Sequence, residues 1–174
     1  MSTPPIITDR PALLRNRARA IEPLLQTIAR DEIQDRLGMV NRSFTTPVVI
    51  TGFPDLWSKL VADAAIIPDE DVLDLSESSS DLIVHALALH WANDPVGQLI
   101  QCRRALLPDG LFLAIAFGGQ TLHELRSALA TAESEVSGGL SPRVLPMADI
   151  REMGALLQRA GFALPVADCV TVKL

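Results

Sequence analysis

The sequence predicts an α/β fold in which a doubly wound, mostly parallel sheet follows an α-helical N-terminal segment. From residue 47 onward, short apolar runs alternate with segments whose apolar residues recur at helical spacing. Before residue 47, apolar residues recur near a 3.6-residue period with arginines and acids between them. We therefore expect a helical cap over residues 1–46 and an α/β domain over residues 47–174.

The first half of the chain is expected to hold two or three helices and up to three strands. Residues 9–40 are typical of helix, kinked or divided at Pro23, because proline lacks the N–H that a helix interior uses. "PVVITGF" (47–53) is the first strand, and Asp55 is expected to cap a helix that extends to about Ala65. Two short runs are candidates for the next strands: "AAII" (64–67) and "DEDVLDL" (69–75).

The second half has clearer boundaries. "DLIVHALAL" (81–89) is nearly all apolar, as is typical of a parallel strand covered on both faces. Asp94 precedes Pro95, which is the usual order of an N-cap and a first-turn proline, so a helix is expected to follow. "PDG" (108–110) predicts a turn, and "LFLAIAF" (111–117) predicts the next buried strand.

Two further helices and a last strand are expected after residue 117. Thr121 and Glu124 have the spacing of a capping box, and the helix behind them carries an apolar stripe that we expect to be buried. The stripe consists of Leu122, Leu125, Leu129 and Ala132. Gly138 is expected to end this helix, Asp149 to cap the last helix, and "VADCVTVKL" (166–174) to form the final strand.

Composition argues against several classes of protein. The formal net charge is −6, whereas nucleic-acid backbones are bound by basic patches, so no nucleic-acid partner is expected. Cys102 and Cys169 lie far apart without metal-ligand spacing, which favours a reducing compartment such as the cytoplasm. No apolar run reaches the roughly 20 residues that span a bilayer. The arginines among residues 1–20 are interpreted as a solvated helix face rather than a transit peptide.

Several motifs resemble the later half of class I S-adenosylmethionine-dependent methyltransferases. They are "LALHWANDPVGQLIQCRRALLPDGLFLA", "GGQTLHELR", "GGLSPRV" and "LLQRAGF". More narrowly, these stretches and "DRPALLRNRARA" (9–20) resemble a methyltransferase type 11-like bacterial branch, similar to the complex I assembly factor methyltransferase-like proteins and to the biotin-synthesis malonyl-carrier-protein methyltransferase. The resemblance implies a Rossmann-like, seven-stranded sheet with S-adenosylmethionine at the carboxyl ends of the first strands. By position, it assigns cofactor binding to Gly52, Phe53, Ala86, Leu87, His90 and Trp91.

The first half departs from this family in the turn after its first strand. The turn has one glycine, Phe53 places a ring where the cofactor needs space, and Pro54 has no N–H to donate. Gly52 and Asp81 are 29 positions apart, whereas one βαβ unit alone needs about 30 residues, so a layer is expected to be shortened or missing. Four acidic residues are candidates for the carboxylate that would bind the ribose of the cofactor. They are Asp63, Asp69, Glu70 and Asp71.

The family also continues beyond the strand expected at 166–174, so the α/β domain is expected to be C-terminally incomplete. The resulting open sheet edge would favour a homo-oligomer.

Two interpretations stay open for His90 and Trp91, which follow the strand expected at 81–89. In the first, His90 acts as a base and the Trp91 ring packs on an adenine or a substrate. In the second, both residues only pack within the fold. His85 is interpreted as a core histidine.

His123 has no second ligand at metal spacing, so no metal site is expected. Two interpretations stay open for Arg126 and Arg143: they are ordinary surface arginines, or they pair with a substrate carboxylate.

Two functional hypotheses follow from these observations. The first is an S-adenosylmethionine-dependent methyltransferase whose acceptor is a small molecule or a protein, with no catalytic residue assigned. The second is a non-catalytic, methyltransferase-like binding or assembly factor, with a respiratory complex as one candidate partner.

Overall fold

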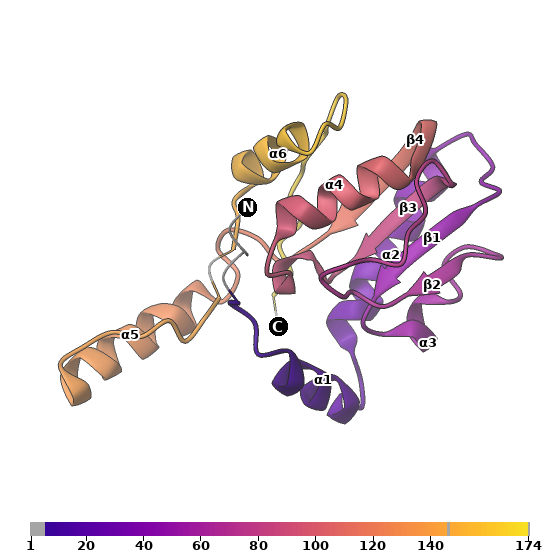
Figure 1. Ribbon diagram of the computed structural model, residues 1–174. Helices are drawn as coiled ribbons and strands as arrows, with labels where there is room; N and C mark the ends of the chain where they lie inside the picture. The colour runs from indigo at the N-terminus through magenta and orange to yellow at the C-terminus, as the bar shows by residue number, and fades with distance from the viewer. Residues whose placement is uncertain (1–5, 146, 174) are drawn as a thin grey trace.

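The central sheet of the protein is parallel throughout. The computed structural model describes residues 6–145 and 147–173, and its sheet has the strand order β2-β1-β3-β4 (Figure 1). The strands are β1 (Pro47–Thr51), β2 (Ala65–Ile67), β3 (Ser80–Ala86) and β4 (Leu106–Ile115). β1 pairs in parallel with β2 and with β3, and β3 pairs in parallel with β4. The predicted α/β class with a parallel sheet is confirmed.

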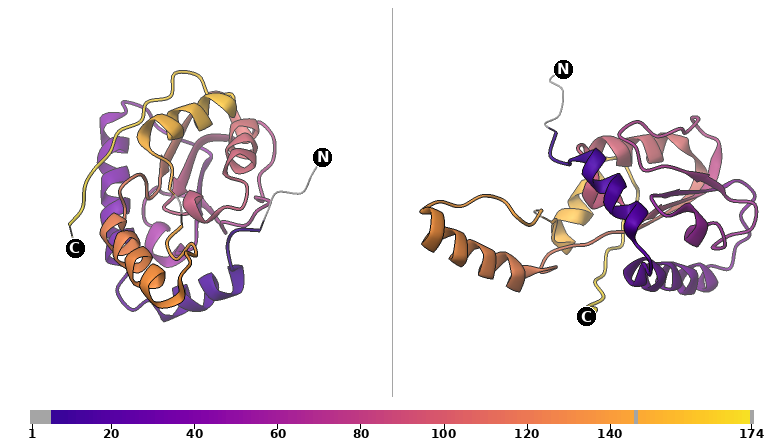
Figure 2. Two further views of the ribbon diagram at one scale, coloured as in Figure 1. Left: turned by 90° about the vertical axis from the view of Figure 1, so that its left-hand side faces the viewer. Right: turned by 90° about the horizontal axis from the view of Figure 1, so that it is seen from below.

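Helices cover both faces of this sheet, as in a doubly wound fold. The helices of the described chain are α1 (Arg10–Arg19), α2 (Leu24–Met39), α3 (Pro54–Trp57), the 3-10 helix η1 (Leu89–Trp91), α4 (Pro95–Ala105), α5 (His123–Ser137) and α6 (Ile150–Arg159). α2 and α3 pack on one face around Val49 and Val84, and α4 packs on the other face around Ile50 and Ile83 (Figure 2). The alternation follows from the pleat of a strand, whose successive side chains point to opposite faces.

The predicted helix boundaries at Pro23, Asp94, Gly138 and Asp149 are confirmed. Pro23 divides the N-terminal helical region into α1 and α2. Asp94 caps α4 by accepting a hydrogen bond from the backbone N–H of Gly97 at 2.8 Å. Asp149 caps α6, and Glu152 completes its capping box. Gly138 ends α5 with a φ of 67°. These boundaries are local, and the sequence around each is sufficient to specify them.

The segment between β1 and β3 is shortened, as the 29-position interval predicted. The helix expected to reach Ala65 ends at Trp57, and Phe53 rather than Asp55 occupies its N-cap position. The strand expected at residues 69–75 is absent from the described chain. Side chains of α4 bind its backbone instead: Gln98 donates to the carbonyl of Glu70, and Gln101 accepts from the N–H of Leu73. Backbone groups bonded in this way are not available to a sheet ladder.

The turn expected at "PDG" lies within β4 as an irregularity of the strand. Ser80 pairs with Leu106, but Leu82 pairs with Leu111, so β4 carries extra residues at this point. Asp109 adopts a φ of 63° inside this insertion. The turn chemistry is therefore present, and the strand continues through it as through a β-bulge.

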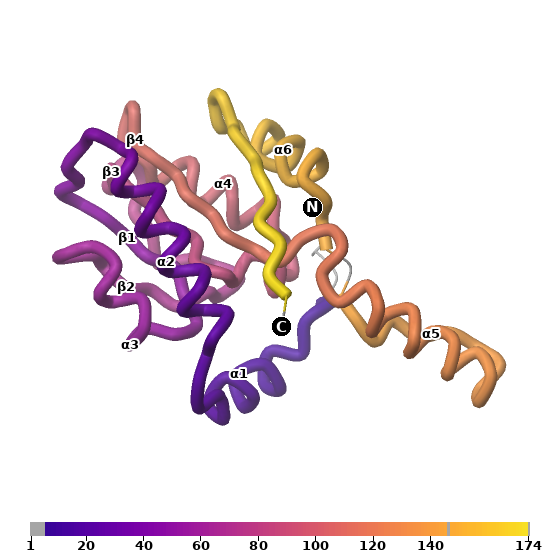
Figure 3. The backbone as a smooth tube through the Cα atoms, turned by 180° about the vertical axis from the view of Figure 1, so that it is seen from behind, coloured from indigo at the N-terminus to yellow at the C-terminus, as the bar shows by residue number. Residues whose placement is uncertain are grey.

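The largest error of the sequence analysis concerns α5. Thr121 forms no capping box: its hydroxyl donates to the carbonyl of Gly118, and Leu122 is the N-cap residue with a φ of 56°. The stripe expected to be buried is solvent-exposed, with Leu125 47% exposed, because α5 projects away from the sheet (Figures 1 and 3). Amphipathic spacing predicts that a face can be buried, but it does not specify which element covers that face.

The final strand expected at residues 166–174 is also not observed over the described part, residues 166–173. These residues run as irregular chain, while Leu174 lies outside the described residues. Among the described strands, β4 therefore pairs only with β3, and the sheet has four strands where the resemblance implied seven.

Candidate functional site

The candidate site lies where the carboxyl ends of β1, β2 and β3 meet. Thr51, the last residue of β1, is paired with Ala86, the last residue of β3. Gly52 follows Thr51, and Asp69 follows two residues after the end of β2. In a parallel sheet these ends share one edge, which is where α/β proteins bind ligands.

An arginine from α1 occupies this edge. Nη1 of Arg17 donates to Oδ1 of Asp69 and Nη2 donates to Oδ2, each at 2.7 Å. The Arg17 side chain is 9% exposed and that of Asp69 is 3% exposed. Arg10, about two turns earlier on the same face of α1, adds a second ion pair to Asp69 at 3.1 Å. Two guanidinium groups thus converge on one buried carboxylate.

Gly52 and Phe53 complete the surroundings of the Arg17 guanidinium. A Cβ at position 52 would lie 2.2 Å from Nη1 of Arg17, so the guanidinium can approach the turn only because residue 52 is glycine. The Cζ atom of Arg17 lies 5.9 Å from the centroid of the Phe53 ring, within the range of a cation–π contact. The phenylalanine that seemed only to obstruct a cofactor therefore has a partner within the chain.

Asp69 carries a buried negative charge at the site. Burial by itself raises the pKa of Asp69, but hydrogen bonds and the positive charges of Arg17 and Arg10 outweigh burial and bring this pKa below its usual value. Among the four carboxylates left open for the ribose, Asp69 is the buried one at the end of β2. Asp71 accepts a hydrogen bond from Asn93.

A cavity of about 250 Å³ remains beside these groups. Its lining includes Leu14, Thr51, Pro54, Ile66, Glu70 and both arginines of the ion pairs. Pockets for drug-sized ligands usually begin near 300 Å³, so the space left by α1 is small for a nucleoside-containing cofactor.

The remaining predicted cofactor residues lie on and after β3. Ala86 and Leu87 are buried, and the N–H of Leu87 donates to the carbonyl of Ile115 at 3.0 Å. His90 and Trp91 lie in η1, half-buried, with ring centroids 5.1 Å apart. The structure thus brings the predicted residues to one edge of the sheet, although their role toward a cofactor stays a prediction.

His90 is neutral at pH 7. Burial, followed by the nearby positive charges, lowers the pKa of His90 to about 4. Its Nδ1 accepts a long hydrogen bond of 3.4 Å from the N–H of Phe117, and its buried Nε2 has no hydrogen-bond partner among the described residues. An N–H at Nε2 would be available to an acceptor atom of a ligand. His85 is a core residue whose Nε2 hydrogen bonds Gln98 at 3.0 Å and whose buried Nδ1 also has no partner among the described residues.

Sequence reasoning missed Arg10 and Arg17 as site residues. The arginines of α1 were expected to be solvated, and this is wrong for Arg17, whereas Arg15 and Arg19 are exposed as expected. A signal was present: positions 10 and 17 are seven residues apart, which places them on the same face of a helix. Nothing in the spacing showed that this face meets an acidic residue at the end of β2.

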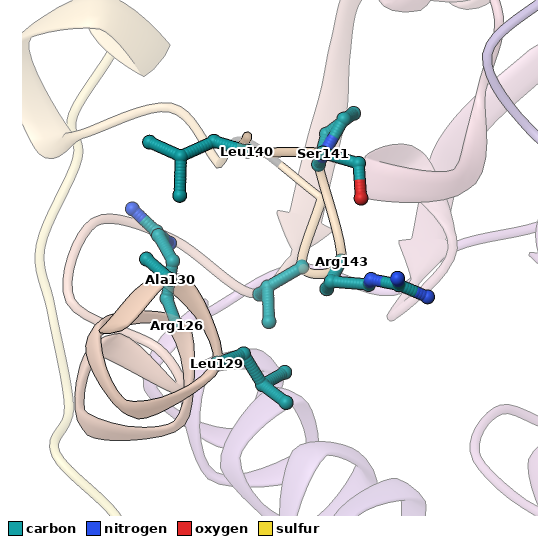
Figure 4. A pocket seen from close by; sticks show the side chains of 8 residues that line it. Arg126, Leu129, Ala130, Leu140, Ser141 and Arg143 are labelled. Atoms are coloured by element: carbon teal, nitrogen blue, oxygen red, sulfur yellow. The ribbon is translucent and has the colours of Figure 1, made fainter. Parts of the chain in front are cut away.

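Arg126 and Arg143 line a second cavity, of about 300 Å³, between α5 and the segment that follows it (Figure 4). The cavity is otherwise mainly apolar, with Leu129 and Leu140 across from each other. Arg143 donates to Glu133 at 2.8 Å, and the hydrogen bonds from Ser141, followed by the one from Arg143, lower the pKa of Glu133 to about 2. Arg143 is thus held by Glu133 within the described chain.

The site and fold define a class of protein. A parallel, doubly wound sheet with its site at the carboxyl edge is the Rossmann-like arrangement of class I methyltransferases. Residues 55–114 match the family model described as a methyltransferase domain. Two solved structures share the fold: a SAM-dependent methyltransferase from Thermotoga maritima (TM-score 0.51, 15% identity, 80% of this chain and 74% of that one) and the Haloferax volcanii methyltransferase complex with its Trm112 activator (TM-score 0.54, 15% identity, 87% and 73%).

Curated relatives place the chain more narrowly. It is 39% identical over 135 residues to "Arginine-hydroxylase NDUFAF5, mitochondrial" of Mus musculus, which covers 78% of this chain and 39% of that protein. It is 36% identical over 113 residues to the malonyl-[acyl-carrier protein] O-methyltransferase of Laribacter hongkongensis (strain HLHK9), covering 65% of this chain and 36% of the relative. The chain belongs to the S-adenosylmethionine-dependent methyltransferase superfamily. It spans less than half the length of these curated relatives.

The described residues also bear on membranes and metals. None of the helices in residues 6–145 and 147–173 is long and apolar enough to cross a membrane. Over the same ranges, no group of three or more histidine, cysteine or acidic side chains is arranged to hold a metal ion.

Proposed function

We propose that this chain is a binding factor built on the methyltransferase fold, and that it does not transfer methyl groups in the conformation described. The observation that carries the proposal is the Arg17 guanidinium, which lies between Gly52 and Asp69 at the edge where the resemblance puts S-adenosylmethionine. A cofactor and this guanidinium would compete for the same carboxylate and the same turn.

The turn after β1 supports this proposal. α3 has four residues and begins with a proline, so few free N–H groups face the site where an α/β protein ordinarily presents a helix N-terminus to its ligand. Arg17, which occupies the site, comes from the segment we assign as the N-terminal cap, residues 1–46. The site itself belongs to the α/β domain, residues 47–174. We propose that the cap acts as the lid of that domain.

Methyl transfer is the second candidate, and two observations favour it. Residues of α1 form one wall of the cavity beside Gly52, and Nε2 of His90 has no hydrogen-bond partner among the described residues. If α1 moved away, S-adenosylmethionine would contact residues of the turn, the end of β3 and η1. These are Gly52, Phe53, Ala86, Leu87, His90 and Trp91. The acceptor would be a small molecule or a protein, as the name of the malonyl-carrier relatives illustrates.

We infer that the partner of the proposed binding factor is a protein. The relatives named arginine-hydroxylase act on arginine, according to that name, and the resemblance to complex I assembly factors makes a respiratory-complex subunit a candidate. The edge of β4 that has no described strand beside it offers a second copy a place to pair. We propose a cytoplasmic location, although the animal relatives are named mitochondrial.

Calorimetric titration with S-adenosylhomocysteine tests the proposal. The unaltered chain is expected to give no saturable heat and no rise in Tm at about 1 mM ligand, since a ligand that binds the folded state must stabilise it. Arg17→Ala and Phe53→Gly are the informative variants. Binding by the unaltered chain would refute the proposal. Binding only by Arg17→Ala would show that α1 closes an otherwise competent site, which favours the second candidate.

A further inference from the structure

We propose that an apolar seam on α5 is a dimer interface, against which α5 of a second copy of this chain packs in the antiparallel direction. The seam consists of Leu125, Leu129, Ala132 and Val136. The inference goes beyond the proposed function, because it does not depend on what occupies the edge formed by β1 and β2.

The seam has the spacing of a coiled coil. Its residues follow one another at alternating intervals of four and three positions, which is the pattern of a heptad repeat. Leu125 is 47% exposed and Val136 is 85% exposed, and none of the residues of α5 is buried. A narrow seam of this kind is typical of paired helices, whereas a helix that covers a globular core carries a wider apolar face.

The position of α5 leaves room for a second copy. α5 projects away from the sheet, and residues 140–144 return beside it (Figures 1 and 3). Leu140 is 71% exposed and lies across the cavity of Figure 4 from Leu129, so it adds apolar surface next to the seam. In an antiparallel pair, the tip of each α5 reaches the base of the other, and the two sheets therefore lie at opposite ends of the helix pair.

Side-chain size is complementary in one register of this pair. When Leu129 faces Ala132 of the second copy, Leu125 faces Val136 of the second copy. A two-fold axis then repeats both contacts, because each copy presents the same surface to the other. Each larger side chain thus meets a smaller one, which is the condition for layers to interdigitate without voids.

Charge favours the same register. It brings Arg126 beside Glu133 of the second copy, on the flank of the seam, and the two-fold axis repeats this pair. Arg126 forms no ion pair within the described ranges, residues 6–145 and 147–173. Glu133 already accepts from Arg143, but a carboxylate can accept from two guanidinium groups, as Asp69 does. A parallel pair would instead put Arg126 beside Thr121 of the second copy and form no charge pair.

The charge of α5 argues against a membrane as the occupant of the seam. Within α5, Glu124, Glu133 and Glu135 outnumber the single arginine, Arg126. Helices that lie on membranes are rich in lysine and arginine on their polar face. A second copy, which supplies both the apolar layers and the opposite charges, fits the seam better.

Sedimentation velocity of the unaltered chain over a range of concentrations tests the inference. A reversible dimer with a Kd on the order of 100 µM is expected, because two helices of 15 residues bury less area than a standard interface. Leu125→Asp should raise this Kd about 10-fold or more. Leu164→Asp is the matched control and should leave it unchanged, since Leu164 is 93% exposed and lies outside α5. A chain that stays monomeric well above the expected Kd, or equal effects of the two variants, would overturn the inference.

Charge reversal tests the register. Arg126→Glu and Glu133→Arg should each weaken self-association about 10-fold, because like charges then replace both opposite pairs. Glu133→Arg also releases Arg143, so the decisive sample is an equimolar mixture of the two variants. The mixture should recover the Kd of the unaltered chain, since both pairs are restored in the heterodimer. No recovery in the mixture would refute the register, and with it the seam as the dimer interface.

Vesicle flotation covers the membrane alternative. The probe is a vesicle of phosphatidylcholine and phosphatidylglycerol, and the unaltered chain is expected not to float with it. Flotation that Leu125→Asp abolishes would assign the seam to a lipid surface and overturn the inference.

Discussion

Replacing Arg17 by alanine should destabilise the protein through Asp69. The substitution removes two charge-assisted hydrogen bonds of 2.7 Å from a carboxylate that is 3% exposed. Breaking a buried ion pair costs about 3–5 kcal/mol when the remaining charge has no other partner. Because Arg10 stays paired with Asp69, we expect a smaller loss, about 2–3 kcal/mol of the free energy of unfolding.

The loss should depend on pH in a defined direction. The folded-state pKa of Asp69 is lowered, so the stability that its charge contributes is fully present above the unfolded pKa of about 3.9 and is lost as the pH falls through the lower folded pKa. The difference between the unaltered chain and Arg17→Ala should therefore be largest near pH 7 and shrink below about pH 4.

Urea denaturation followed by the fluorescence of buried Trp57 measures this difference. Arg15→Ala is the matched control, since Arg15 lies on the same helix and is exposed, and it should change stability by less than about 0.5 kcal/mol. The reasoning would be refuted if the two variants were equally stable, or if the effect of Arg17→Ala were the same at pH 7 and pH 3.

Three further predictions concern the fold. Trp57→Phe should cost about 1–3 kcal/mol in urea denaturation, because it leaves the buried Gln26 oxygen without its 2.8 Å hydrogen bond; an unchanged midpoint would contradict that bond. Asp149→Ala should lower the free energy of unfolding by about 1 kcal/mol through loss of the α6 cap, unless calorimetry finds the same Tm as before. Leu129→Ser on α5 should cost under about 0.5 kcal/mol, whereas Leu99→Ala in the core should cost about 2–5 kcal/mol; comparable losses would show that α5 is covered.

Local signals explain the parts of the fold that could be predicted. The caps at Asp94 and Asp149 act within one helical turn, and the nearly all-apolar run at β3 requires only that the strand be covered on both faces. The count of residues between Gly52 and Asp81 correctly predicted a shortened layer, since the length of a βαβ unit is set by geometry.

The errors arose where distant residues decide the outcome. The segment 69–75 has apolar residues at strand spacing, but Gln98 and Gln101 of α4 take its backbone groups. The stripe of α5 has the spacing of a buried face, yet none of the residues of α5 is buried. Neither result can be read from the local pattern, because each depends on tertiary contacts.

For the same reason, only part of the site could be predicted from the sequence. Resemblance located Gly52 and the end of β3, while the closing contact joins residues 17 and 69, which are 52 positions apart. The contact of the Phe53 ring with Arg17 could not be predicted either, because it also joins the turn to α1.

A double-mutant cycle between Gly52 and Arg17 tests the central claim most directly. Gly52 has no left-handed φ, so alanine is compatible with its backbone, and the added Cβ would collide with the Arg17 guanidinium at 2.2 Å. We predict that Gly52→Ala costs about 2 kcal/mol alone and less than about 0.5 kcal/mol in the Arg17→Ala background, as expected for residues in direct contact. Equal costs in both backgrounds would contradict the claim that Arg17 fills this site.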